Sequence, residues 1–217
     1  MIDFAVKVLL AYLIGSVLGS MVVGRLRGGV DIRSMGSGNP GGTNALRTQG
    51  KAFAAAVMLI DVGKGWLASA VLPPLSLPAI PRAVPPIAAW LPVACATAVI
   101  VGHVYPVFYG LRGGKGVATF LGAVLGLLPW LVVPLLLMWL LIAVLSGFVS
   151  VASIATAVSL PVFLWVGEVQ PRAPLLAFGL FVAVFVALTH RANFVRLRRG
   201  TEPRARRLWL FGRRGPR

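Results

Sequence analysis

Residues 127–145 read LLPWLVVPLLLMWLLIAVL, and no charged side chain interrupts these 19 residues. A helix on the surface of a soluble protein needs a polar face toward water, whereas a run of this kind needs lipid or other apolar helices on every side. Similar runs recur along the 217 residues, of which 58% are hydrophobic and only 12% charged. The sequence therefore predicts an all-α, polytopic membrane protein.

At about 20 residues per crossing, the apolar runs predict seven transmembrane helices. The first run follows Lys7 and resembles a signal peptide, but its small residues recur at helical spacing and no clear cleavage site follows, which favours a retained span. Pro129 permits either a tight turn or a kink inside one long helix. The expected helices lie near residues 4–23, 52–72, 86–103, 117–128, 130–145, 151–166 and 174–189.

The net charge of +16 is concentrated in a few segments, and ten of the 21 basic residues lie in the tail at 191–217. Basic residues beside spans stay in the cytoplasm and attract anionic lipid, so we interpret this charge as a topology signal and expect membrane lipid, not nucleic acid, as partner. With seven spans, the segments on the side of the tail hold 17 basic residues. We expect one integral-membrane domain over 1–217, with the N-terminus outside and the C-terminus cytoplasmic.

The first polar loop contains GSGNPGGTNALR at residues 36–47. Closely spaced glycines let backbone N–H groups turn toward one point, and the hydroxyl and amide side chains add donors for a phosphate. The glycine spacing also fits a dinucleotide fingerprint, but a membrane span precedes it where a strand is required. A flexible polar loop remains the alternative. The candidate ligands are Ser37, Gly38, Asn39, Gly41, Thr43, Asn44 and Arg47.

The second loop reads GHVYPVFYGLRGGKGVAT at residues 102–119. Gly113, Gly114 and Gly116 surround Lys115 just before a predicted helix, where backbone donors, an ammonium group and the helix dipole favour an anion. The loop is not a Walker motif, because the first glycine and the Ser or Thr ligand of magnesium are missing. For His103, a structural role is favoured over a role as general base.

The third segment reads HRANFVRLRRGTE at residues 190–202, at the end of the last span. His190, Asn193 and Leu197 share one helical face, so the first two can point together toward the other loops. A plain basic membrane anchor is the alternative, and it leaves the His and Asn unexplained. Ser150 lies in a short turn expected on the same side, as a helix-packing or substrate-binding residue.

Charged residues elsewhere are few. Asp61 and Lys64 lie inside the second predicted span, where each needs a partner, so they are expected to pair and to hold helices in place. Asp31 and Glu202 are the only loop carboxylates on the predicted inner side, and the single Cys95 excludes an intramolecular disulfide and a cysteine zinc site. Nucleophile triads, paired carboxylates and metal ligands thus lack support, and a site of anion-binding donors suits substrates that already carry an activated phosphate.

Together the three segments strongly resemble the signature motifs of the bacterial membrane-integral acyl-phosphate:glycerol-3-phosphate acyltransferases. GSVLGSMVVGRL at 15–26 and DVGKG at 61–65 extend the resemblance over about residues 15–202. The chain departs at Leu18, where the family often has Pro, and at Gly42, where it often has Ala. The class of glycerophosphate acyltransferases that has a His and an Asp with four residues between them is excluded, because Phe108 and Val195 occupy the Asp positions after His103 and His190.

The resemblance implies a seven-helix fold and acyl transfer from acyl phosphate to glycerol 3-phosphate without acyl carrier protein, coenzyme A or a cofactor, and no metal is expected. We hypothesise that the loop at 37–44 holds acyl phosphate. The acyl phosphate oxygen or His190 would accept the proton. An anion or organophosphate transporter is the rival from another class, but it predicts internal repeats that are not evident. The groups expected to receive glycerol phosphate are Arg47, Lys115, His190 and Asn193.

Overall fold

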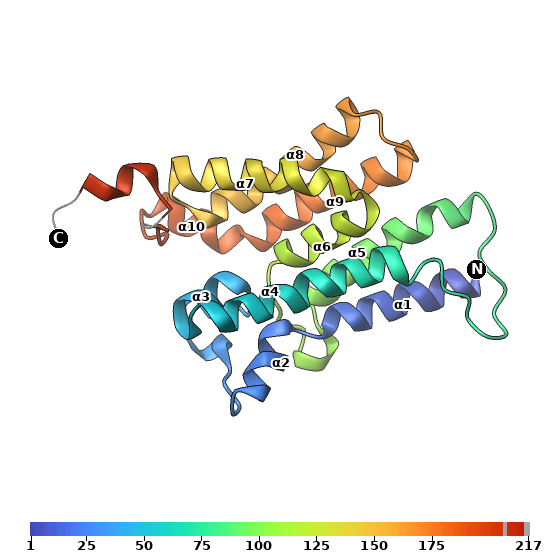
Figure 1. Cartoon of the computed structure of the whole chain (residues 1–217), viewed down its shortest axis with the longest axis horizontal. Helices are drawn as coiled ribbons and strands as arrows, with labels where there is room; N and C mark the ends of the chain where they lie inside the picture. Colours follow the sequence, from blue (N-terminus) through green and yellow to red (C-terminus); the bar gives the residue numbers. More distant parts are fainter. Residues whose placement is uncertain (206–207, 215–217) are drawn as a thin grey trace. The chain divides into compact units, whose positions relative to one another are not determined.

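The computed structural model of the chain describes residues 1–205 and 208–214, so residues 206, 207 and 215–217 of the predicted basic tail lie outside the described residues. The chain forms two compact units, Met1–Pro129 and Trp130–Arg217. Every regular element in the described ranges is a helix (Figure 1). The all-α prediction is therefore confirmed.

Five helical segments are long and apolar enough to cross a membrane, and a sixth is a bent pair of helices. The helix of the remaining predicted crossing, α6, has 11 residues and a length of about 17 Å, roughly half of a bilayer core of about 30 Å. The described residues therefore support a multispanning protein with five or six long crossings. The five are Lys51–Val71, Ile87–Tyr109, Pro129–Ser146, Val149–Val166 and Arg172–Thr189.

The first predicted span is broken. Helix α1 (Ile2–Ser16) and helix α2 (Gly19–Leu26) are bent by 48°, so the prediction of one continuous helix over 4–23 is wrong. Val17 and Leu18 have extended backbone angles between the two helices, although neither is Pro. The break releases backbone groups from the helix ladder, and such groups are costly in an apolar environment unless other groups bind them.

Side chains of α4 (Lys51–Trp66) bind these released groups. The Lys64 ammonium group donates to the carbonyl oxygens of Gly15 at 3.0 Å and Val17 at 2.7 Å, and Asp61 accepts from the backbone N–H of Gly19 at 3.1 Å. Lys64 and Asp61 also form an ion pair of 2.9 Å, which confirms the predicted pairing. The pair thus holds the broken span against α4.

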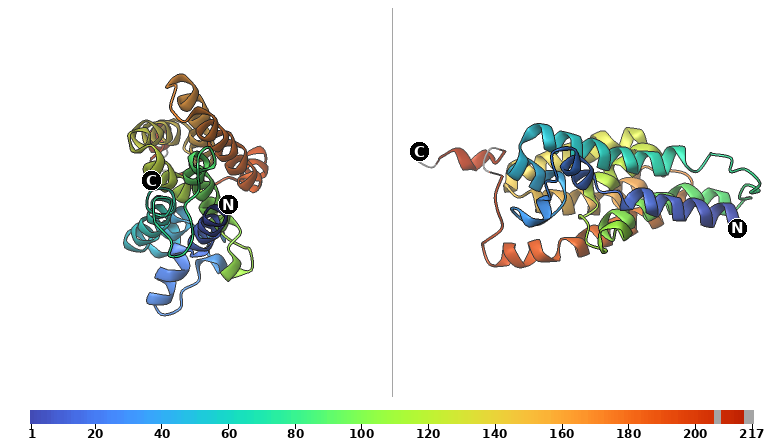
Figure 2. Two further views of the ribbon diagram at one scale, coloured as in Figure 1. Left: turned by 90° about the vertical axis from the view of Figure 1, so that its right-hand side faces the viewer. Right: turned by 90° about the horizontal axis from the view of Figure 1, so that it is seen from below.

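Glycines allow the helices of the first unit to approach closely. A Cβ atom on Gly15 would collide with the backbone of Val99 in α5 (Leu91–Val104), which lies alongside α1 (Figures 1 and 2). On α4, a Cβ atom on Gly65 would collide with the backbone around Thr119 in α6 (Val117–Leu127). These contacts are of the type that small residues provide between membrane helices.

The Pro-rich segment at 72–86 is pinned to the start of α1. Asp3 and Lys7 are both buried and form an ion pair of 2.9 Å. Lys7 donates to the carbonyl oxygen of Pro73 at 2.9 Å, and Asp3 accepts from the N–H of Ala83 at 3.1 Å. The segment is therefore held by specific contacts near both of its ends.

The second unit contains α7 (Val132–Ser146), α8 (Val149–Val166), α9 (Arg172–Thr189) and the short α10 (Arg191–Arg198). Helix α8 packs against both α7 and α9, and the Trp139 indole donates to Ser153 at 3.2 Å. Before this unit, α6 ends at Leu127 and a 3₁₀ turn spans Pro129–Leu131. Two separate helices, not one continuous helix, therefore account for residues 117–145.

Candidate active site

The first loop is organised around the buried side chain of Asn44. Its amide oxygen accepts from the N–H of Ser37 at 3.0 Å, and its amide nitrogen donates to the carbonyl oxygens of Ile32 at 2.9 Å and Met35 at 3.0 Å. Asn44 belongs to α3 (Gly42–Gln49), which packs on α4. The structure therefore gives Asn44 a role in shaping the loop, and its predicted direct contact with substrate stays a prediction.

Some of the expected phosphate donors are engaged within this loop. The N–H of Ser37 binds Asn44, and the N–H of Gly38 donates to the carbonyl oxygen of Met35 at 3.0 Å. Gly41 is the N-cap residue of α3 and has no side chain that could cap the helix. Thr43 and Arg47 are exposed on α3. An anion at this loop could thus be bound by the backbone N–H groups in the first turn of α3 and by the exposed side chains of Thr43 and Arg47.

Asp31 and Arg33 form a tight pair at the start of the loop. Arg33 Nη2 lies 2.8 Å from Asp31 Oδ2, and Arg33 Nε lies 3.0 Å from Asp31 Oδ1. The hydrogen bonds from Arg33 lower the pKa of the Asp31 carboxyl below its usual value, so Asp31 is ionised at neutral pH. The Arg33 guanidinium group also lies 5.7 Å from the ring centre of Tyr109. This pair ties the first loop to the second.

The second loop turns back onto the end of α5. The N–H of Gly113 donates to the carbonyl oxygen of Val104 at 3.0 Å, and the N–H of Gly114 donates to the backbone carbonyl oxygen of His103 at 3.1 Å. The expectation that these two N–H groups are available to a phosphate is therefore wrong. They satisfy carbonyl groups at a helix end instead, and the substrate-binding role predicted for the two glycines stays untested.

His103 is buried at the centre of the first unit. Its Nδ1 atom lies 2.8 Å from Lys64 Nζ and 3.5 Å from an oxygen of Asp61. A Cβ atom on Gly114 would collide with the His103 ring at Nε2. His103 thus occupies the structural position that the sequence favoured, and it connects the ion pair of α4 to the glycine turn that precedes Lys115.

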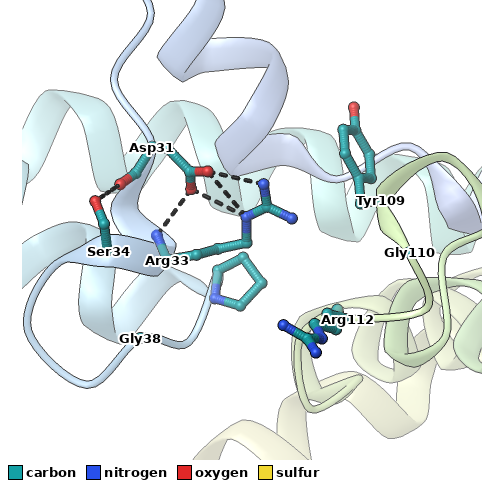
Figure 3. Close-up of a pocket in the computed structure, with 9 residues that line it drawn as sticks. Asp31, Arg33, Ser34, Gly38, Tyr109, Gly110 and Arg112 are labelled. Carbon is teal, nitrogen blue, oxygen red and sulfur yellow. Dashed lines mark hydrogen bonds and ion pairs between the residues drawn. The ribbon is translucent and has the colours of Figure 1, made fainter.

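An open cleft of about 720 Å³ separates the two loops (Figure 3). Three charged side chains line it, Asp31, Arg33 and Arg112, and Figure 3 shows the Arg112 guanidinium group turned from the second loop toward the first. The structure therefore brings the first and second motifs together around a polar space. The remaining lining residues are Ser34, Gly38, Pro40, Tyr109, Gly110 and Gly113.

The third motif lies in the second unit, where His190 and Asn193 are both buried. His190 separates α9 from α10, and its Nδ1 atom lies 2.8 Å from the carbonyl oxygen of Val186. A carbonyl oxygen can only accept a hydrogen bond, so Nδ1 carries the proton in neutral His190 and Nε2 holds the lone pair. This assignment makes Nε2 the ring nitrogen that is able to act as a base.

Glu202 gathers polar side chains around the third motif. Its carboxylate accepts from Asn193 at 2.6 Å, from Ser150 at 2.8 Å and from Arg196 at 2.7 Å. Burial alone would raise the pKa of Glu202, but the hydrogen bonds from these side chains outweigh burial and leave the pKa below its usual value. An ionised Glu202 therefore fixes the positions of Ser150 and Asn193, two predicted substrate residues whose contact with substrate stays a prediction.

Comparison with known proteins identifies the family. A family model described as glycerol-3-phosphate acyltransferase matches residues 5–200. The chain belongs to the glycerol-3-phosphate acyltransferase family. The family includes similar proteins named glycerol-3-phosphate acyltransferase. One from Bordetella pertussis (strain Tohama I) is 44% identical over 91% of this chain and 89% of its own length, and one from Thioalkalivibrio sulfidiphilus is 40% identical over 91% of each chain.

Solved structures of the glycerol-3-phosphate acyltransferase family share this fold. The chain is 34% identical to PlsY (YgiH), described as an integral membrane glycerol 3-phosphate acyltransferase, in its glycerol 3-phosphate form. The match has a TM-score of 0.80 and covers 93% of this chain and 94% of PlsY. The lysophosphatidic acid form of PlsY gives a TM-score of 0.79. This chain is accordingly a multi-pass membrane protein of the acyltransferase family.

Within this glycerol-3-phosphate acyltransferase fold, the sequence did not single out Arg112 or Arg33, and it did not predict that Ser150 and Asn193 bind Glu202. Asp31 and Arg33 are only two residues apart, so their pairing was open to prediction from spacing. The Ser150–Glu202 contact joins residues 52 positions apart and leaves no local signal. In the part of the chain that the structure describes, no group of three His, Cys, Asp or Glu residues is arranged to hold a metal ion.

Proposed function

We propose that this chain transfers a fatty acyl group from acyl phosphate to the 1-hydroxyl of glycerol 3-phosphate. The products are 1-acyl-glycerol 3-phosphate (lysophosphatidic acid) and inorganic phosphate, in the first step of bacterial phospholipid synthesis. The single observation that carries the proposal is the pairing of the first and second motifs around one cationic cleft in a chain of this acyltransferase family. Neither acyl carrier protein nor a coenzyme A thioester takes part.

The first part of the proposed mechanism is electrostatic. Two phosphate groups must lie close together, and their repulsion has to be offset by cations and N–H groups. Arg47 on α3 and Lys115 before α6 supply positive charge, and the first turns of these helices supply backbone N–H groups. The loop at 37–44 holds acyl phosphate in this scheme, with Ser37, Asn39 and Thr43 as donors.

The second part is the transfer step. The 1-hydroxyl oxygen attacks the acyl carbon, an ester bond forms, and the bond between the acyl carbon and the phosphate oxygen breaks. The hydroxyl proton passes either to an oxygen of the leaving phosphate or to Nε2 of His190. The Nδ1 hydrogen bond to Val186 supports the second route, because it leaves the lone pair on Nε2. Holding hydroxyl and acyl carbon in place supplies a large part of the rate.

We propose a membrane topology as well. Seven crossings, with α6 as the short one, put the N-terminus outside and the C-terminus in the cytoplasm of the bacterial inner membrane. Of the 21 basic residues, 17 then lie on the cytoplasmic side, as the positive-inside rule requires. The three motifs share that side with water-soluble glycerol 3-phosphate.

Phosphate release by the purified protein tests the proposed reaction. Palmitoyl phosphate is supplied with and without glycerol 3-phosphate, beside a Lys115→Ala variant and a Lys51→Ala control that removes an exposed lysine from the start of α4. We expect release that requires the acceptor, yields acylated glycerol phosphate, falls at least tenfold in Lys115→Ala and persists in Lys51→Ala. Release without the acceptor would identify a hydrolase, and no release from folded protein would reject the transferase.

A further inference from the structure

The cleft between the first and second loops contains two arginines, but only one of them carries an uncompensated charge. Arg33 is held by Asp31 through contacts of 2.8, 3.0 and 3.1 Å, and its guanidinium group lies over the Tyr109 ring. The carboxylate is ionised beside it, so the pair has no net charge. Arg33 therefore helps to shape the cleft but adds little net attraction for an anion.

Arg112 is different. It lines the cleft and is exposed, and none of the residues described in the structure forms an ion pair or side-chain hydrogen bond with it. The charges lining the cleft are those of Asp31, Arg33 and Arg112, which leaves a net charge of +1. That charge comes from a guanidinium group, whose planar fork of donors suits two phosphate oxygens.

The backbone holds Arg112 in place by a turn that is unfavourable on its own. Gly110 and Leu111 both adopt left-handed backbone angles, with φ of 63° and 59°, and this conformation is unfavourable for Leu111 because it has a Cβ atom. The turn is fixed to the end of α5, because the N–H of Leu111 donates to Pro106 at 3.0 Å and the N–H of Gly113 donates to Val104 at 3.0 Å. Arg112 thus projects from a turn with a defined geometry.

The walls of the cleft indicate what it accepts. Gly38, Gly110 and Gly113 contribute no side chains, and the other lining residues are Ser, Pro, Tyr or charged. Among the described residues, no Leu, Ile, Val, Phe or Met side chain lines the cleft, so a fatty acyl chain would find no aliphatic side chain of these types to pack on, whereas the phosphate group of a small molecule can reach charged and hydroxyl groups. The cleft is therefore suited to a water-soluble phosphate and not to a lipid tail.

We propose that this cleft binds a phosphate dianion and that Arg112 is the residue that attracts and positions it. The inference rests on the proposed acyl transfer, in which two such ions occur: glycerol 3-phosphate on its way in and inorganic phosphate on its way out. Asp31 limits the affinity of the cleft for the anion, because it neutralises the charge of Arg33. The net charge of the cleft, and not the number of arginines, sets the affinity.

Equilibrium binding and kinetics of the full-length protein in detergent or lipid nanodiscs test this inference. Binding of labelled glycerol 3-phosphate and of labelled inorganic phosphate is measured without acyl donor, and kcat, KM and the inhibition constant of phosphate are measured with it. The variants are Arg112→Gln, Arg112→Lys, and Arg112→Gln combined with Asp31→Asn. Arg27→Gln is the control, because Arg27 is exposed in the same unit and does not line the cleft.

Arg112→Gln is expected to weaken binding of one or both ions about tenfold, with kcat within about twofold and a weaker dependence of affinity on salt. Arg112→Lys keeps the charge and should stay within about threefold of the unaltered protein. Asp31→Asn frees the charge of Arg33 and should restore most of the affinity in the Arg112→Gln background. If Arg112→Gln weakens the binding of glycerol 3-phosphate alone, the cleft binds the acceptor. If it weakens the binding of inorganic phosphate alone, the cleft binds the leaving product.

The inference is overturned if Arg112→Gln binds both ions like Arg27→Gln, or if Asp31→Asn restores nothing while melting temperatures show that the variants are folded. The binding assay contains no acyl donor, so its result does not depend on the transfer reaction. Intact binding by the unaltered protein without any acyl transfer would reject the proposed function and leave the cleft standing. Normal transfer with no effect at Arg112 would reject the cleft and leave the function standing.

Discussion

The Nζ atom of Lys64 lies 2.7 Å from the carbonyl oxygen of Val17, at the point where the first span breaks. The same ammonium group binds Gly15, Asp61 and His103, so one buried cation joins α1, α4 and α5. Since α2 leads into the first motif and His103 supports the second, this cation links the fold to both loops of the candidate site.

Lys64→Met removes the donor for two released carbonyl groups and leaves Asp61 as an uncompensated buried charge. We expect a loss of about 3–5 kcal/mol in the free energy of unfolding, measured by denaturation in detergent. Lys51→Met, on the exposed start of α4, should stay within about 0.5 kcal/mol. Combining Lys64→Met with Asp61→Asn should recover part of the loss, and equal stability of Lys64→Met and Lys51→Met would contradict this account of the break.

Gly65→Ala tests the close packing of α4 on α6. The new Cβ atom would collide with backbone atoms around Thr119, which cannot rotate away, so we expect a loss of about 1–3 kcal/mol or a failure to fold. Gly63→Ala is the matched control on the same helix, because no described atom outside the adjacent turns of α4 lies within 4 Å of its added Cβ. The measurement is the melting temperature of both variants in the same detergent. Equal melting temperatures would contradict the close packing of α4 on α6.

The helix ranges were largely predictable, because long apolar runs have few structural alternatives. The ranges of α8 and α9 agree with the expected spans within two residues at both ends of each helix. The break at Val17 and Leu18 was not predictable from propensity, since it depends on Lys64 and Asp61 more than 40 positions away. Gly113 and Gly114 look like phosphate donors in sequence, and only the fold shows that their N–H groups bind the end of α5.

Glu202→Gln tests the cluster that holds the third motif. The folded-state pKa of Glu202 lies below its usual value of 4.5, so its stabilising contribution is present above pH 4.5 and is lost as the pH falls through the folded-state pKa. Melting temperatures should therefore differ between the variant and the unaltered protein at pH 7 and converge in acid. Glu168→Gln, an exposed control, should show no such difference, and a gap that persists at low pH would contradict the charged role of Glu202.

His190→Asn separates a base from a binding residue. Asn retains a side-chain donor for the Val186 carbonyl group but has no basic nitrogen. If His190 accepts the proton, kcat should fall by roughly 10²–10⁴ while KM for glycerol 3-phosphate changes little. A rise in KM alone would assign His190 to acceptor binding and leave the proton to the phosphate oxygen.

The choice of acyl donor is the central claim, and a direct comparison of donors tests it. Purified protein is given glycerol 3-phosphate with palmitoyl phosphate, palmitoyl-coenzyme A or palmitoyl-acyl carrier protein in parallel, and lysophosphatidic acid is measured by mass spectrometry. The account predicts product from palmitoyl phosphate alone, with one phosphate released per acyl group transferred. Product from either thioester at a comparable rate, or none from palmitoyl phosphate, would contradict it.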